Sequence, residues 1–223
     1  MRNVTFFKIY ILFSILYLIV LLSGHENLDL FLKPILIPLL GFGVYFYQKF
    51  PSKNILLTAL LFSWIGDVIL LFADIAEIYF ILGLVSFLIA HIAYCVLFNK
   101  QNTLELHINK ALFIIGSLLI AFYLIGMITV LMPHLGELKI PVVVYASVIS
   151  IMLLFAFNGY LIWKRKGALY IFLGAAVFVA SDSILAMNKF HAPIYKSSFF
   201  IMLTYLVAQY LIVMGVLKMN PKK

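Results

Sequence analysis

Two aspartates, Asp67 and Asp182, lie in stretches of sequence that are otherwise apolar enough to cross a lipid bilayer. Residues 55–73 read ILLTALLFSWIGDVILLFA, and residues 167–188 read GALYIFLGAAVFVASDSILAMN. A charged side chain in hydrocarbon costs roughly 2.5–3.5 kcal/mol on insertion scales, so a retained acid usually has a function. Two carboxylates can also divide their roles, one as a general acid and one as a base. The alternative is that each acid only joins helices by hydrogen bonds.

Other polar side chains lie in the same apolar segments. His91 and Tyr94 belong to GLVSFLIAHIAY at residues 83–94, Tyr205 and Gln209 lie one turn apart near the C-terminus, and Ser181 precedes the second acid. A histidine at this depth can relay protons or orient an acid. A hydrogen-bonded core histidine is the structural alternative. We interpret this group as supporting or proton-relay residues.

A third set of polar residues lies at the expected outer ends of the membrane segments. Lys33 lies at the outer end of the expected helix 29–48, Asn188 and Lys189 lie at the outer end of the expected helix 167–188, and Asp74 lies in a short joint. Two ammonium groups at this rim can hold a lipid phosphate, whereas lysines that reach the interface without a ligand are the alternative. The histidines lack HxxxH or ExxH spacing, so we expect no metal and no cofactor.

The composition indicates a membrane protein that spans the bilayer several times. The 223 residues are 65% hydrophobic and 11% charged, whereas soluble domains are about 45–50% apolar and about 25% charged. The net charge of +8 comes from basic residues in loops, which membrane topology explains better than nucleic-acid binding does. The expected partners are therefore the lipid bilayer and a lipid substrate, with no nucleic acid.

The apolar segments predict an all-α, eight-helix transmembrane bundle that forms a single transmembrane domain, residues 1–223. Twelve of the 16 Lys and Arg residues fall on one side of this topology, which places both termini in the cytoplasm. We expect the bacterial cytoplasmic (inner) membrane, with the first apolar segment retained. The expected helices are 4–22, 29–48, 54–73, 77–98, 108–130, 141–163, 167–188 and 194–217.

Two short segments of the first half resemble segments of the second half. GDVILL at residues 66–71 resembles SDSILA at 181–186, and FLIAH at 87–91 resembles YLVAQ at 205–209. A four-plus-four parallel repeat would make the third and seventh helices equivalent, and likewise the fourth and eighth. Chance similarity between apolar sequences is the alternative.

The sequence resembles the YhhN-like lysoplasmalogenase family of small eight-span membrane proteins. The resemblance rests on Lys33-Pro34, FSWIGDVILL around Asp67, GLVSFLIAHIAY, GAAVFVASDSILAMNKF around Asp182 and YLVAQYLI, and it covers residues from about 33 to 215. It implies hydrolysis of the vinyl ether bond of a lysoplasmalogen to a fatty aldehyde and a glycerophospho-head group. Asp67 and Asp182 can divide acid and base roles in that reaction, because its oxocarbenium chemistry resembles that of glycosidases.

Other classes of function remain open from the residues alone. A proton-coupled transporter or lipid flippase would use the same acids as a proton relay. A lipid-binding or sensory module would show no turnover. An intramembrane aspartyl protease fits less well, because Asp182 follows AVFVAS instead of the GxG of a GxGD pattern. Aldehyde release in detergent distinguishes the enzyme from the transporter, which needs a sealed vesicle and a gradient.

Overall fold

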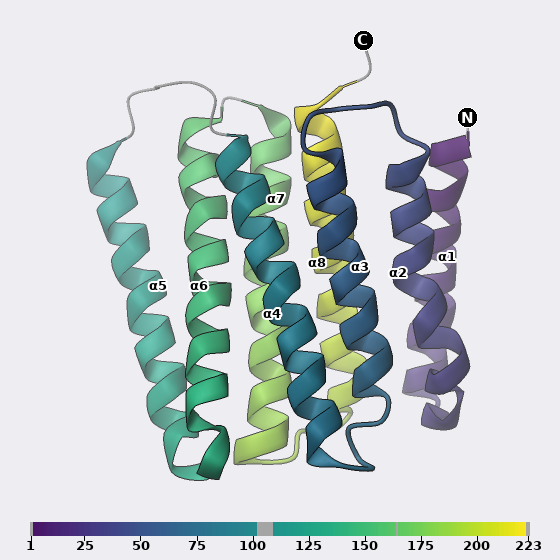
Figure 1. Ribbon diagram of the computed structural model, residues 1–223, viewed down its shortest axis with the longest axis vertical. Helices are drawn as coiled ribbons and strands as arrows, with labels where there is room; N and C mark the ends of the chain where they lie inside the picture. Colours follow the sequence, from purple (N-terminus) through teal and green to yellow (C-terminus); the bar gives the residue numbers. More distant parts are fainter. Residues whose placement is uncertain (1, 102–108, 164, 222–223) are drawn as a thin grey trace. The chain divides into compact units, whose positions relative to one another are not determined.

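The computed structural model describes residues 2–101, 109–163 and 165–221, and these residues form α-helices with no strand (Figure 1). Lys164, Lys222 and Lys223, which belong to the twelve basic residues expected on the cytoplasmic side, lie outside the described residues. Residue 108, the expected start of the fifth helix, also lies outside them. The α-helices of the described chain are α1 (Arg2–Leu22), α2 (Asp29–Tyr45), α3 (Lys53–Leu70), α4 (Glu77–Lys100), α5 (Lys110–Leu131), α6 (Lys139–Ile162), α7 (Lys166–Ala186) and α8 (Ser197–Met219).

The expected helix limits differ from the observed ones by no more than three residues where the chain is described. The largest difference at a helix start is at α8, which begins at Ser197 instead of residue 194. Lys196 has a φ of 53°, in the left-handed region, and so cannot continue a helix backwards. At the other end of this connection, α7 continues into a π-helical turn, Met187–His191.

Seven helices among the described residues are long and apolar enough to cross a bilayer, and the prediction of eight spans is correct for these seven. The second helix is shorter than expected, because α2 ends at Tyr45 and has 17 residues. At 1.5 Å per residue it is about 25 Å long, against a hydrocarbon core of about 30 Å. An eighth span and the cytoplasmic position of both termini therefore stay predictions.

The described chain divides into two compact units, residues 2–94 and 95–221, and the boundary falls within α4. In the first unit, α2 packs against both α1 and α3. A Cβ added at Gly66 of α3 would lie 2.6 Å from the ring of Phe87, so α3 and α4 also approach closely there. The single domain and the four-plus-four repeat stay predictions.

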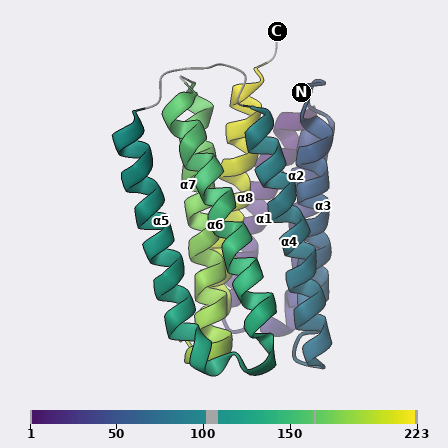
Figure 2. The same ribbon diagram turned by 60° about the vertical axis from the view of Figure 1, so that its left-hand side comes forward.

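In the second unit, α7 packs against both α6 and α8, and α5 packs against α6. These four helices run roughly parallel to one another (Figure 2). The α7–α8 interface uses glycines in place of larger side chains. A Cβ at Gly174 would lie 2.9 Å from the Ile212 nitrogen, and one at Gly167 would lie 2.5 Å from the Gly215 oxygen. Small residues of this kind let membrane helices pack backbone to backbone. This packing fixes the helix that carries Asp182.

Candidate functional site

Asp67 lies in the first unit and forms an ion pair with Lys33. The Lys33 Nζ atom is 3.9 Å from Asp67 Oδ1, and the side chains are 14% and 4% exposed, respectively. The structure thus places the Lys33 ammonium group beside the buried acid. Its expected contact with a lipid head group stays a prediction.

The helix dipoles do not explain why these two charges are where they are. Asp67 lies in the last turn of α3, near the negative end of that helix dipole. Lys33 lies early in α2, near the positive end of its dipole. Neither dipole therefore stabilises its charge, and the stabilising contact that the structure shows is the opposite charge of the partner.

A tryptophan sets the alignment of α2 and α3 beside this pair. Pro38 has no N–H group, so the carbonyl of Pro34, four residues earlier, has no helical donor. The indole Nε1 of Trp64 donates to that carbonyl at 2.8 Å. Pro34 follows Lys33, and Trp64 precedes Asp67 by three residues. The same hydrogen bond that satisfies the proline carbonyl thus brings the lysine opposite the aspartate.

On its other side, α3 is held by α4. The Ser86 hydroxyl donates to the Phe62 carbonyl at 2.6 Å. Phe87 lies against Gly66 and stacks on His91, with 6.5 Å between the ring centroids. His91 is fully buried. Phe87 therefore links this predicted relay residue to the backbone next to Asp67.

Two further polar residues of the first unit are buried near these contacts. Tyr94, one turn beyond His91, is fully buried. Ser63 precedes Asp67 by one helical turn and is also fully buried, and its hydroxyl has no hydrogen-bond partner among the described residues. This hydroxyl is available to a polar group that enters beside the acid.

Asp182 lies in the second unit and is half-buried on α7. The hydroxyl of Tyr145, from α6, donates to its Oδ2 atom. The neighbouring Ser183 donates to the Val179 carbonyl at 2.6 Å. Because its one hydrogen is used there, Ser183 accepts the hydrogen bond that joins it to Tyr123 of α5. Tyrosines from α6 and α5 therefore form hydrogen bonds with the second acid and with the residue that follows it, respectively.

The other relay candidates of the second unit lie on the α7–α8 interface. The Ser181 hydroxyl donates to the Ile201 carbonyl at 2.9 Å, which gives this serine a helix-joining role. Tyr205 is buried and meets Phe178 edge to face at 5.5 Å, and Phe178 precedes Asp182 by one turn. Gln209 is fully buried one turn beyond Tyr205. Their proton-relay roles stay predictions.

The remaining head-group candidates lie in connections between helices. Asn188 Oδ1 accepts a hydrogen bond from the Ile194 N–H at 2.8 Å, so its side chain closes the turn that leads into α8. Lys189 is exposed in the π-helical turn, and Asp74 is exposed between α3 and α4. Their contact with a lipid head group stays a prediction. Across the described residues, no three His, Cys, Asp or Glu side chains come together as metal ligands would.

Sequence reasoning missed two residues that hold the acids in place. Trp64 could have been found from the prolines at positions 34 and 38, because this spacing leaves a carbonyl that needs a donor. Tyr145 shares a helical stripe with the buried residues Ile149 and Met152. That stripe predicts an inward-facing phenol, but no pattern in the sequence assigns it to Asp182.

The fold and the comparisons with known proteins define the class of this protein and its family. The seven helices of the described residues that can cross a bilayer make it an integral multi-pass membrane protein. The YhhN family model matches residues 28–216, and the chain belongs to this family. It is 32% identical over 184 residues to the lysoplasmalogenase TMEM86A of Bos taurus, which covers 79% of this chain and 71% of that protein. The same values hold for the lysoplasmalogenase TMEM86A of Homo sapiens. No solved structure matches the chain.

Proposed function

We propose that this protein hydrolyses the vinyl ether bond of a lysoplasmalogen, with the ethanolamine or choline form as the lysophospholipid substrate. The observation that carries the proposal is the similarity to two lysoplasmalogenases in a chain that keeps two acids inside membrane helices. Each acid also has a specific partner, Lys33 for Asp67 and Tyr145 for Asp182. A transporter would explain the acids equally well, but it would not explain the similarity.

The reaction needs one water molecule, a proton donor and a proton acceptor. A proton adds to the vinyl carbon that is remote from the ether oxygen, which gives an oxocarbenium ion. Water adds to this cation and loses a proton to give a hemiacetal. The hemiacetal then loses its hydroxyl proton while the bond to the glycerol oxygen breaks and that oxygen takes up a proton, which gives a fatty aldehyde and the free glycerol hydroxyl. A general acid is therefore required for the first step and a base for the second.

The two acids suit these steps by their surroundings. Asp67 is ion-paired with Lys33, and we assign it the role of the carboxylate that takes the proton from water. Asp182 accepts a hydrogen bond from Tyr145, which fixes the orientation of the carboxyl group, and we assign it the role of proton donor to carbon. His91 and Tyr94 support Asp67 through α4, on the side where Phe87 packs.

Turnover by the purified protein tests the proposal. The protein in detergent is incubated with lysoplasmenylethanolamine, and fatty aldehyde and glycerophosphoethanolamine are quantified. We expect both products in equal amounts without any ion gradient, and no aldehyde from Asp67→Asn or Asp182→Asn. Glu137→Gln, which changes an exposed acid between α5 and α6, is the control and should keep full activity.

Two results would count against the proposal. No aldehyde from the folded wild-type protein, together with proton-driven lipid movement in sealed vesicles, would favour the transporter. Full activity in either aspartate variant would remove that residue from the mechanism.

We further propose that the protein lies in a bacterial cytoplasmic membrane with both termini inside. The excess of Lys and Arg in one set of loops supports this orientation. Fusions at the C-terminus test it, because green fluorescent protein folds in the cytoplasm and alkaline phosphatase is active outside. Phosphatase activity without fluorescence would reverse the assignment.

A further inference from the structure

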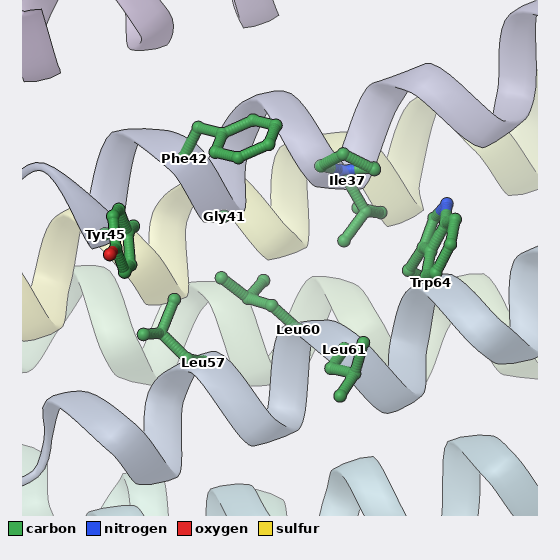
Figure 3. A pocket seen from close by; sticks show the side chains of 9 residues that line it. Ile37, Gly41, Phe42, Tyr45, Leu57, Leu60, Leu61 and Trp64 are labelled. Atoms are coloured by element: carbon green, nitrogen blue, oxygen red, sulfur yellow. The ribbon is translucent and has the colours of Figure 1, made fainter.

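An apolar groove runs between α2 and α3 in the first unit (Figure 3). Its volume is about 400 Å³, within the range of roughly 300–1,000 Å³ that is typical of small-molecule sites. Trp64 lies at one end and Tyr45 at the other (Figure 3). The residues that line the groove are Ile37, Pro38, Gly41, Phe42, Tyr45, Leu57, Leu60, Leu61 and Trp64.

On α3 the groove leads toward the first acid. Leu57, Leu60 and Trp64 recur at helical spacing and form one stripe. The next position of that stripe, three residues after Trp64, is Asp67. The stripe of α3 that lines the groove therefore reaches a charged residue within one turn of the groove's end.

On α2 the groove leads to the partner of that acid. Ile37, Gly41 and Tyr45 are spaced four residues apart along the groove. The preceding position of this stripe is Lys33, which forms the ion pair with Asp67. The faces of α2 and α3 that line the groove thus both continue to the same charged pair, which lies one turn beyond the lining residues.

Gly41 provides part of the space in the groove. A Cβ added at Gly41 would meet no other atom within 4 Å. A Cβ added at Gly43, two residues further along, would lie 2.4 Å from the Phe7 ring of α1. Gly43 therefore serves helix packing, whereas the missing side chain of Gly41 leaves the groove open.

We propose that the α2–α3 groove binds the hydrocarbon chain of a single-chain lipid whose polar end lies at Lys33 and Asp67. This inference rests on the proposed function and specifies where the substrate chain lies. From Leu57 to Trp64 the groove follows seven residues, or about 10 Å of helix. It holds the part of the chain nearest the glycerol, and the remaining carbons continue into the bilayer. The groove is a single cavity between two helices, and a single cavity suits a lysolipid, which has one hydrocarbon chain.

Filling the groove at Gly41 tests this placement by chain-length selectivity. Gly41 lies eight residues, or about 12 Å, from Lys33, so a leucine there meets long chains and spares short ones. We expect Gly41→Leu to lower kcat/KM at least tenfold for a 16-carbon lysoplasmalogen and less than twofold for a 6-carbon one. Gly126→Leu is the matched control, because Gly126 of α5 also has no atom within 4 Å of an added Cβ. This control should keep the wild-type selectivity.

A binding measurement keeps the inference testable without turnover. The chain has two tryptophans, so Trp163→Phe leaves Trp64 as the only indole fluorophore. Lysophosphatidylethanolamine with bromine on its chain should quench Trp64 in detergent micelles, and a diacyl lipid with the same bromine content should quench it less. Gly41→Leu should lose this difference and Gly126→Leu should keep it. If Gly41→Leu does not fold, the second variant is Leu57→Phe, which narrows the groove at the Tyr45 end (Figure 3).

These readouts separate failure of the inference from failure of the proposed function. Selective quenching without aldehyde release would retain the chain-binding groove and refute the hydrolase. Aldehyde release with unchanged chain-length selectivity in Gly41→Leu would retain the hydrolase and refute the groove. Equal quenching by lysolipid and diacyl lipid would show that the groove only faces bulk lipid, and it would also overturn the inference.

Discussion

The ion pair between Lys33 and Asp67 is expected to be strongly coupled. The two atoms are 3.9 Å apart and both side chains are largely buried. At an effective dielectric constant of about 20, two unit charges at that distance attract by about 4 kcal/mol. Removing one partner of a buried pair typically costs about 3–5 kcal/mol, because the other charge is left without compensation. Lys33→Met and Asp67→Asn should therefore each destabilise the protein by about 3–4 kcal/mol.

A double-mutant cycle measures the coupling directly. Unfolding of the wild type, the two single variants and the double variant is followed in mixed micelles as the fraction of denaturing detergent rises. The double variant has no isolated charge, so it should lose much less stability than the sum of the two single losses, and the coupling should be about 3–4 kcal/mol. Lys139→Met, which removes an exposed lysine at the start of α6, should change stability by less than about 0.5 kcal/mol.

Additive losses would refute this reasoning, because they would show that the ammonium and carboxylate groups do not interact in the folded protein. A stable Lys33→Met variant would refute it as well. The turnover of the same four proteins carries separate information. A double variant that regains stability but not turnover would show that the pair is kept for chemistry and not for folding.

Three further substitutions have defined outcomes. Tyr145→Phe removes a hydrogen bond to the Asp182 carboxyl group, which is worth about 0.5–1.5 kcal/mol when that group is protonated. It should lower kcat/KM in the aldehyde assay by roughly 2- to 12-fold. Trp64→Phe leaves a proline carbonyl without its donor and should destabilise the protein by about 1–3 kcal/mol in detergent unfolding. Gly174→Ala places a Cβ 2.9 Å from a backbone nitrogen of α8, and overpacking of this kind should lower the free energy of unfolding by about 1–3 kcal/mol.

Matched controls distinguish these effects from general damage. Tyr160→Phe removes an exposed hydroxyl from the same helix as Tyr145 and should leave turnover unchanged. Gly126→Ala adds a methyl group in open space and should not destabilise the protein. Equal losses in a variant and its control would contradict the role assigned to the contact.

Most of the fold follows from the sequence for a simple physical reason. A span must satisfy its backbone hydrogen bonds internally, so each long apolar segment forms a helix. The exception is α2, where apolar character continues past Tyr45 but the helix ends there. The start of α8 also differs from the expected residue 194, because the left-handed turn at Lys196 has no signal in hydropathy.

The candidate site could be predicted less completely. Asp67 and Asp182 are evident from the sequence because a charge in a membrane segment is costly. Their partners are not evident, since the Lys33–Asp67 pair depends on how α2 and α3 are aligned by Trp64. Tyr145 is one of 13 tyrosines, and only the packing of α6 on α7 selects it. The groove beside Gly41 is a property of two helices together, which no single segment encodes.

The most direct test of vinyl ether hydrolysis is to run the reaction in D₂O and reduce the aldehyde at once to its alcohol. Protonation at carbon predicts one deuterium at carbon 2 of that alcohol from the wild-type protein, and no alcohol from Asp67→Asn or Asp182→Asn. An alcohol without deuterium at carbon 2, or the same labelled product from either aspartate variant, would contradict acid–base hydrolysis by these two residues.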